Sequence, residues 1–177
     1  MQEKKLNKNT DKEILIELMG NYGDMVLRIA FTYVKEQQLA EDLAQDIFIR
    51  CYQKLHTFEE RSSYRTWLYR ITVNHCKDYV GSWSFKNLIP AEYFNSEKTY
   101  EDVSEQVIEN EQNKLLFQKV LKLSVKLREV VIFYYYEELT IEEIADLLNI
   151  KENTVKTRLY RARKNLKKVL KGGEVFE

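Results

Sequence analysis

The feature that most constrains the fold is the stretch from Thr140 to Lys168, where two helical patterns flank a short break. The first has apolar residues at steps of three and four, which places them on one helix face. Thr140 precedes this run and Glu143 follows three residues later, the capping-box arrangement that satisfies free N–H groups at a helix start. The spacing resumes from Val155 to Val169. Two amphipathic helices joined by a three- to four-residue turn predict a helix-turn-helix.

The second helix of this motif is strongly basic on one side. Against the single acid Glu152 it carries seven bases: Lys156, Arg158, Arg161, Arg163, Lys164, Lys167 and Lys168. A charge run can be only a solvated surface. The cap, the turn length and the one-sided charge agree, however, and together they favour a helix that enters a DNA major groove.

Composition favours an all-α protein. The 177 residues are 44% hydrophobic and 32% charged, which is typical of globular proteins, and five Gly and one Pro are few for the turns of a β protein. The N-terminus is polar and charged, and the longest apolar run, 130–136, is too short to span a bilayer, so we expect a cytoplasmic protein. Cys51 and Cys76 are expected to be reduced thiols in or near a core.

The net charge of zero conceals two opposite clusters. Residues 90–112 hold seven acids and one base, whereas residues 152–170 hold seven bases and one acid. Helical periodicity also dissolves between about 81 and 110. We therefore predict two small helical domains, residues 1–80 and 111–177, joined by a flexible acidic linker at 81–110. The second would be a four-helix domain ending in the helix-turn-helix.

The first domain is expected to begin with a frayed tail at residues 1–10 and two helical segments within 11–34, broken near 20–23. A further helix over 40–55 has a wide apolar stripe: Leu43, Ala44, Ile47, Phe48, Cys51, Tyr52 and Leu55. Its opposite face carries Glu41, Asp42, Gln45, Asp46, Arg50, Gln53 and Lys54. From periodicity alone, that face is better interpreted as solvated surface.

A polar loop at 56–65 precedes a helix over 66–80. Bases there, such as Arg65, Arg70 and Lys77, are interleaved with aromatic residues: Phe58, Tyr64, Trp67 and Tyr69. This mixture suits a single-strand binder, in which cations follow phosphates and bases stack on rings at about 1–3 kcal/mol each. For Trp67 and Tyr69, a place in the core is at least an equal interpretation.

No catalytic or metal-binding motif is present. Phosphate-binding Gly-rich loops, GxSxG and HExxH are absent, and His75-Cys76 supplies too few ligands for zinc. We therefore expect no enzyme activity, cofactor, metal or small-molecule substrate.

Three blocks in order resemble the extracytoplasmic-function sigma factors, small members of the sigma-70 family of bacterial transcription initiation factors. They are AEDLAQDIF, RSSYRTWLYRITVNHCKDY and LREVVIFYYYEELTIEEIADLLNIKENTVKTRLYRARKNL. The resemblance implies that the first domain, region 2, binds RNA polymerase and opens the −10 element. It implies that the second domain, region 4, binds the −35 element.

The resemblance also implies residue roles. It assigns docking on the clamp of the polymerase β′ subunit to Asp42, Gln45 and Asp46. It assigns −10 DNA binding, including capture of a flipped base by the serine–tyrosine loop, to Ser62, Ser63, Tyr64, Trp67, Asn74 and Lys77. It assigns −35 DNA to Lys156, Thr157, Arg158, Tyr160, Arg161, Arg163 and Lys164. Among these, Arg161 suits a guanine edge, whereas Arg158, Arg163 and Lys164 suit phosphates.

The implied function is an alternative sigma factor that directs core polymerase to promoters and promotes DNA melting. Its implied partners are core polymerase (the β′ clamp and the β subunit), promoter DNA as duplex and non-template strand, and an anti-sigma factor that could hold it at the membrane. Two alternatives stay open from the residues: an autonomous helix-turn-helix regulator, and a helical protein-interaction module whose basic helix binds an acidic protein surface.

Overall fold

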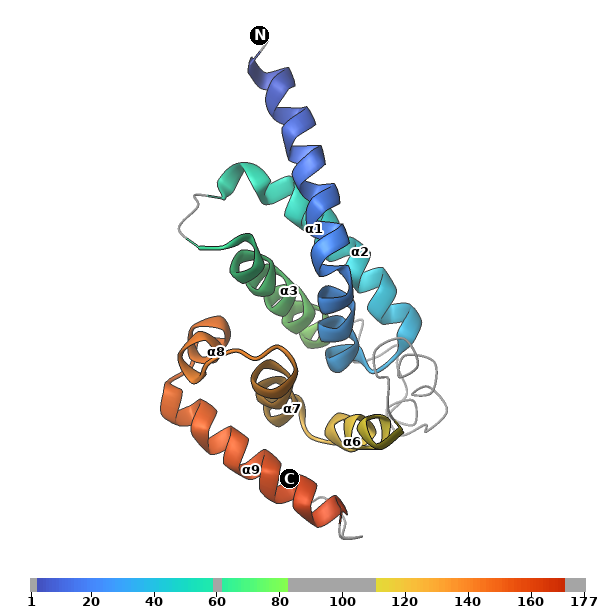
Figure 1. Ribbon diagram of the computed structural model, residues 1–177, viewed down its shortest axis with the longest axis vertical. Helices are drawn as coiled ribbons and strands as arrows, with labels where there is room; N and C mark the ends of the chain where they lie inside the picture. The colour runs from blue at the N-terminus through green and yellow to red at the C-terminus, as the bar shows by residue number, and fades with distance from the viewer. Residues whose placement is uncertain (1–2, 59–61, 83–110, 171–177) are drawn as a thin grey trace. The chain divides into compact units, whose positions relative to one another are not determined.

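A computed structural model describes residues 3–58, 62–82 and 111–170, whose regular structure is helical throughout (Figure 1). The chain divides into two compact units, residues 1–93 and 94–177. The predicted linker at 81–110 lies almost wholly outside the described residues. The described helices confirm the predicted all-α class.

The first unit contains α1 (Glu3–Val34), α2 (Gln37–Lys54), a short 3-10 turn η1 (Leu55–Thr57) and α3 (Tyr64–Gly81). α1 packs against both α2 and α3, and α2 packs against α3. The hydrophobic side chains with at most 1% exposure that fill the space between these helices are Val26, Ile29, Ala30, Phe31, Ala40, Leu43, Ile47, Cys51, Leu68, Val73 and Cys76. Burial of each large apolar side chain contributes about 1.5–3 kcal/mol before entropy is counted.

The predicted break in α1 is wrong, because the helix runs without interruption through Gly20 and Gly23. Residues 3–10, predicted as a frayed tail, belong to the same helix. Each glycine costs a helix interior roughly 1 kcal/mol relative to alanine. Leu18 before the glycines and Met25 after them are both buried. Packing against α2 and α3 therefore holds the helix through the weak positions.

A side-chain cap sets the start of α2 at Gln37, three residues earlier than predicted. Lys35 turns the chain with a left-handed φ of 58°. The Glu36 carboxylate then accepts hydrogen bonds from the backbone N–H groups of Gln38 at 3.0 Å and Leu39 at 2.6 Å. These bonds satisfy donors that the helix leaves open, and the negative charge suits the helix N-terminus.

The apolar stripe predicted for α2 is largely confirmed, with Leu43, Ile47, Phe48, Cys51 and Leu55 buried. Tyr52 is the error, since it is 40% exposed. The predicted apolar stripe is wider than the surface of α2 that α1 and α3 cover, so Tyr52, at its edge, faces solvent.

The second unit contains α6 (Glu111–Leu121), α7 (Val125–Val131), a π-helical turn η4 (Ile132–Tyr136), α8 (Ile141–Leu148) and α9 (Glu152–Leu170). α6, α7 and α8 all pack against α9. Its buried core consists of Phe117, Val120, Leu121, Leu123, Val130, Val131, Ile132, Phe133, Ile144, Ala145, Leu148, Val155, Leu159 and Ala162.

The predicted regular helix over 126–138 is only partly right. After Val131 it widens into η4, where the backbone N–H of Glu137 bonds the carbonyl oxygen of Ile132, five residues back, at 3.0 Å. Tyr134 and Tyr135 are 38% and 50% exposed. Their rings pack edge to face, with 5.0 Å between the ring centroids. Periodicity assumes a constant helical pitch, so it does not detect a π turn.

Across the described residues, no helix is both long and apolar enough to cross a membrane. In the same ranges, no three His, Cys, Asp or Glu side chains gather where they could hold a metal ion.

Candidate nucleic-acid interface

The helix-turn-helix predicted from the sequence is confirmed in the second unit. Thr140 Oγ1 accepts a bond from the N–H of Glu143 at 3.2 Å, and the Glu143 carboxylate accepts one from the N–H of Thr140 at 2.8 Å. This complete capping box starts α8. Asn149, with φ of 53°, ends the helix in the left-handed conformation that asparagine tolerates. The turn then leads directly into α9.

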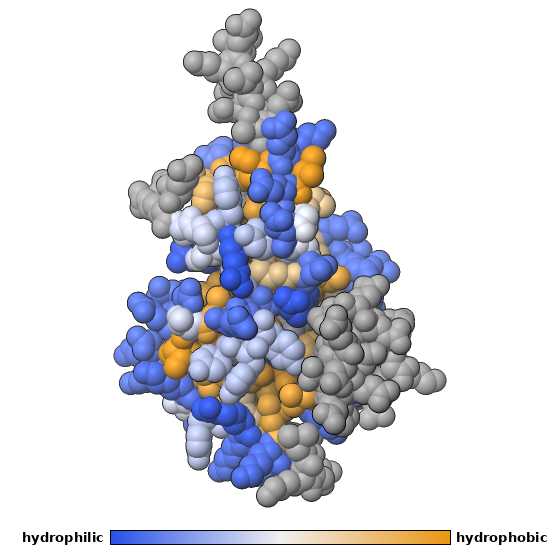
Figure 2. Space-filling view, viewed as in Figure 1, coloured by the Kyte–Doolittle hydropathy of each residue, from blue (hydrophilic) through white to orange (hydrophobic). Residues whose placement is uncertain are grey.

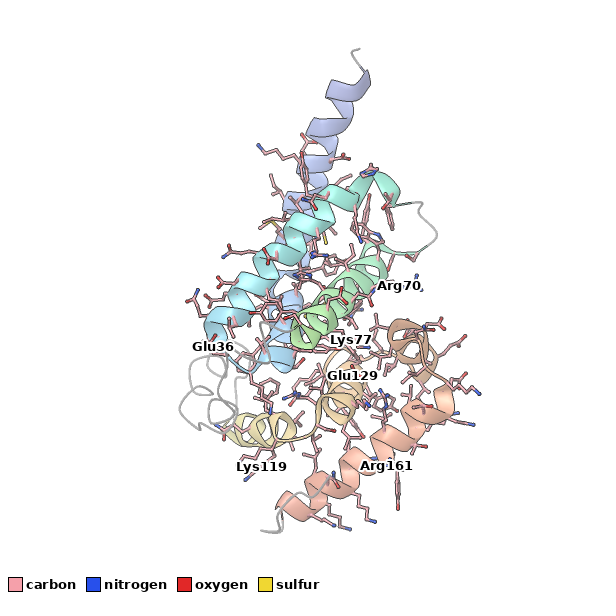
Figure 3. All side chains as sticks on the ribbon, turned by 180° about the vertical axis from the view of Figure 1, so that it is seen from behind. Glu36, Arg70, Lys77, Lys119, Glu129 and Arg161 are labelled. Carbon is pink, nitrogen blue, oxygen red and sulfur yellow. The ribbon has the colours of Figure 1, made fainter. Side chains whose placement is uncertain are left out.

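α9 buries one face and exposes a basic one. Val155, Leu159 and Ala162 are buried against the rest of the unit. The exposed site residues predicted for −35 DNA are Lys156, Thr157, Tyr160, Arg161, Arg163 and Lys164. Figure 2 shows hydrophilic surface along this helix, and Figure 3 labels Arg161 on it. The helix therefore offers hydrogen-bond donors to phosphate oxygens and base edges.

Three exposed side chains on α9 have further features. Tyr160 is 63% exposed, so its ring and hydroxyl group are accessible to a partner. Thr157 donates its hydroxyl proton to the carbonyl oxygen of Asn153 at 2.8 Å, so its oxygen and methyl group remain for contact. Lys156 Nζ lies 3.4 Å from Glu152 Oε2. This exposed ion pair contributes little energy, so Lys156 can exchange the Glu152 carboxylate for a phosphate.

The structure gives Arg158 a different environment from the other α9 bases. Its Nη1 donates to Glu129 Oε1 at 2.8 Å, and the two side chains are 19% and 4% exposed. The sequence predicted a phosphate contact, but this guanidinium is bound to a buried carboxylate of α7. Its partner Glu129 lies 29 positions earlier in the chain, and helical periodicity does not reveal such a distant contact.

Aromatic rings surround the start of α3 in the first unit. Ser63 caps the helix, accepting a bond from the N–H of Thr66 at 3.1 Å. The Phe58 ring stacks on the Tyr64 ring, with 4.3 Å between the ring centroids, and is tilted against the Trp67 ring, with 5.4 Å between the centroids. Ser62, Tyr64 and Trp67 are each partly exposed. The structure thus brings these predicted −10 residues together, and it adds Phe58 as the ring that supports Tyr64.

Tyr69 does not belong to this exposed aromatic group. It is 3% exposed, and its hydroxyl oxygen accepts a bond from Arg65 at 3.2 Å. The Arg65 guanidinium also lies 5.5 Å from the ring centroid. Of the two interpretations left open for Tyr69, the core is the correct one.

Farther along α3, Asn74 is exposed and Lys77 is half-buried. Arg70, also exposed, precedes Asn74 by four residues and therefore lies on the same helix face. Figure 3 labels Arg70 and Lys77 on this helix. The sequence placed Arg70 among the bases interleaved with aromatic residues, but the resemblance did not assign it to the −10 site. Its spacing of four and seven from Asn74 and Lys77 was the signal that could have added it to that site.

The predicted polymerase-binding residues Asp42, Gln45 and Asp46 are exposed on α2. Ile49, seven residues after Asp42, lies on the same face and is 56% exposed. Ile49 therefore adds one apolar side chain to an otherwise polar face. The sequence prediction did not assign Ile49.

Buried titratable groups lie behind these faces. Neither ring nitrogen of His75 has a hydrogen-bond partner among the described residues. Burial lowers the pKa of His75, and Arg50 lowers it further, against the opposite effect of Asp46 and Asp78. Cys51 and Cys76 are free and buried, as expected. Burial raises the pKa of Cys51 to about 12 and raises that of Cys76, so both stay protonated thiols.

Two family descriptions match the chain: Sigma-70 region 2 over residues 18–83, and Sigma-70, region 4 over residues 114–166. The ECF RNA polymerase sigma factor SigW of Bacillus subtilis (strain 168) is 31% identical, over 93% of this chain and 92% of its own. The RNA polymerase sigma-H factor of Pseudomonas aeruginosa is 28% identical, over 90% of this chain and 88% of its own.

Two solved structures share the fold. The sigma factor RpoE, in complex with the anti-sigma factor NepR from Bartonella quintana, aligns with a TM-score of 0.66 and 22% identity, over 90% of this chain and 98% of its own. CnrH, in complex with the cytosolic domain of CnrY, aligns with a TM-score of 0.66 and 19% identity, over 94% of each chain.

The helix-turn-helix with a basic exposed face in the second unit, the exposed aromatic group in the first unit, and the matches to regions 2 and 4 agree with one another. The chain belongs to the sigma-70 family and is an extracytoplasmic-function sigma factor, an alternative subunit that directs RNA polymerase to promoter DNA.

Proposed function

We propose that the chain divides promoter recognition between its two units. Residues 1–80 act as region 2, which binds core polymerase and opens the −10 element, and residues 111–177 act as region 4, which reads the −35 element. Residues 81–110 link them. The observation that carries this division is that two candidate surfaces lie in separate units. The exposed basic face of α9, the second helix of the helix-turn-helix, lies in one unit, and the aromatic group of α3 lies in the other.

In the second unit, Arg161 and Lys156 contact base edges, with Thr157 and Tyr160 beside them. Arg163 and Lys164 contact phosphates, which position the helix without reading sequence. Support comes from the exposure of all six side chains on a helix whose opposite face is buried. A bidentate arginine–guanine pair is worth about 1–3 kcal/mol of discrimination.

In the first unit, the rings of Tyr64 and Trp67 receive an unstacked base, while the Phe58 ring supports Tyr64 from behind. Ser62 contributes a hydroxyl beside them, and Ser63 holds the start of α3. Extruding a base costs a few kcal/mol, which stacking and edge hydrogen bonds must return. The stacked and tilted rings at 4.3 and 5.4 Å support this role.

The α3 face of Arg70, Asn74 and Lys77 contacts the edge of the −10 duplex. Arg70 extends the cationic surface by one turn beyond the residues that the resemblance assigned to the −10 site. Its exposure supports this addition.

The α2 face of Asp42, Gln45 and Asp46, with Ile49 at its C-terminal end, binds the polymerase clamp. An anti-sigma factor controls the protein by competing for these surfaces in the cytoplasm. Support for such a partner comes from the two complexes in which proteins of the same fold carry an anti-sigma factor or a cytosolic partner domain. The chain has no catalysis of its own in this scheme.

Run-off transcription with purified bacterial core polymerase tests the proposal. Core enzyme is assayed with and without the full chain on a promoter library. Initiation that requires the protein, from sites sharing paired −35 and −10 elements, is the expected result. If core alone yields the same products while the protein still shifts duplex DNA, the autonomous regulator is the correct function.

A further inference from the structure

The ion pair between Glu129 of α7 and Arg158 of α9 lies next to the surface proposed to read the −35 element. Six of the seven bases on α9 are exposed, and Arg158 is half-buried. Its partner Glu129 is 4% exposed, with 2.8 Å between Nη1 and Oε1. A carboxylate this buried is costly unless it is paired, so the bond holds both side chains in place.

Glu129 lies on a firmly anchored segment. Its neighbour Arg128 is 2% exposed and donates from Nη1 to the carbonyl oxygen of Leu121, at the end of α6, at 3.0 Å. Val130 and Val131, next along α7, are also buried. The carboxylate is therefore presented to α9 from a part of the unit that has little freedom to shift.

Arg158 lies on the flank of α9, between its buried face and its exposed face. Leu159, the next residue, is buried, whereas Arg161, one turn later on the same flank, is exposed (Figure 3). The apolar contacts of Leu159 with its neighbours are non-directional. A charge-assisted hydrogen bond is directional, so it restricts rotation of α9 about its own axis.

We propose that the Glu129–Arg158 pair is a positioning element for −35 recognition. It sets the rotation of α9 so that Arg161 and Lys156 meet the correct base edges, and it keeps the Arg158 charge away from the phosphates. The pair thereby supports sequence discrimination rather than affinity. This inference rests on the proposed −35 role of α9. Base readout tolerates errors of only about 0.5 Å or 10–20° in side-chain placement, which is why a fixed rotation matters.

Arg158 could act as a phosphate contact or as a positioning residue, and the two roles predict opposite results. As a phosphate contact, Arg158→Gln would weaken binding equally on all sequences and lower the salt slope by about 0.9. As a positioning residue, Arg158→Gln lowers discrimination between the correct −35 element and single-base variants by about tenfold, the value of one good base contact. The salt slope then stays unchanged.

The variant Glu129→Gln gives the sharper test, because it touches no DNA in either role. It releases the Arg158 guanidinium beside the groove face. Discrimination should fall about tenfold, while affinity for non-matching DNA rises and the salt slope steepens by about 0.9 as one more cation meets phosphate. Glu142→Gln, which removes an exposed acid from α8, and Lys167→Gln, which removes an exposed base from α9, are the matched controls and should keep the wild-type ratio.

Holoenzyme reconstituted from core polymerase and the full chain is titrated with a promoter selected in the run-off assay and with copies altered at single −35 base pairs. The ratio of two affinities from one preparation is independent of the fraction of active protein, so partial misfolding does not disturb it. Arg158→Lys, which keeps the charge but loses the planar fork, should retain an intermediate ratio. The double variant Glu129→Gln with Arg158→Gln should be no worse than either single variant.

Unchanged discrimination in Glu129→Gln, or fully additive losses in the double variant, would overturn the positioning role. If wild-type holoenzyme itself does not distinguish altered −35 elements, the proposed −35 function has failed instead. These two failures are therefore distinguishable in the same experiment.

Discussion

We expect sequence reading by α9 to depend on Arg161 more than on any other residue. Its side chain is exposed, and its fork geometry matches a guanine edge. We expect Arg161→Ala to lose about 1–3 kcal/mol of discrimination at one −35 base pair. Holoenzyme affinities on single-base promoter variants measure this loss. The matched variant Arg163→Ala should weaken all sequences alike and lower the salt slope by about 0.9. Equal weakening by Arg161→Ala on every sequence would move that residue to a phosphate role.

We expect His75 to make the stability of the first unit depend on pH. Its pKa is lowered from the ordinary 6.5 in the folded protein, so below that pH the unfolded chain takes up a proton more readily than the folded one. The free energy of unfolding should therefore be highest above pH 6.5 and should fall as the pH drops toward the folded-state pKa. Urea titrations from pH 8 to pH 5 test this.

The variant His75→Leu should remove this component of the pH dependence, because it replaces the buried imidazole with an apolar group. His56→Asn is the control, since His56 is exposed in η1 and its replacement should keep the wild-type profile. A His75→Leu profile that matches the wild type between pH 5 and 7 would assign the dependence to other groups.

Among the helices, α2 has one buried face and one exposed face. One face packs in the core, and the other exposes Asp42, Gln45, Asp46 and Ile49. We expect Asp42→Ala with Asp46→Ala to weaken core-polymerase binding about tenfold or more, as interface truncations do at central positions. Exposed substitutions cost little stability, so helical content should stay intact.

Binding of labelled protein to core polymerase, with circular dichroism alongside, measures both outcomes. The control is Glu13→Ala with Glu17→Ala, which removes two exposed acids from α1 in the same unit. Equal core affinity in wild type and the α2 variant would show that polymerase binds elsewhere.

At the scale of the whole molecule, the two units have separate hydrophobic cores, so we expect two unfolding transitions rather than one. Thr140→Ala removes the capping box of α8 and should destabilise only the second-unit transition, by about 1 kcal/mol. Ile47→Ala opens a cavity in the first core and should shift only the other transition, by about 2–5 kcal/mol. Calorimetry of the full chain separates the two. Thr140→Ser, which keeps the hydroxyl, is the control, and a single transition shifted by both variants would contradict independent folding.

Features that depend on neighbours in the chain could be predicted from the amino-acid sequence. The spacing of Ile144 and Leu148 defined the buried face of α8, and the Thr140–Glu143 box marked its start, because capping bonds join residues only three apart. The all-α class and the basic face of α9 were equally readable, since both follow from composition and a helical period.

Tertiary structure decided the features that depend on distant partners. Packing against α2 and α3 carried α1 through Gly20 and Gly23, where local propensity predicted a break. Placement also separated Tyr69, which is buried, from Tyr64, which stacks on Phe58 near solvent, although both are aromatic residues of one helix. Arg158 has the same chemistry as its exposed neighbours on α9. Only the fold brings the Glu129 carboxylate, 29 residues away, within 2.8 Å of it, because the energy of burying that charge depends on which elements pack together and not on local sequence.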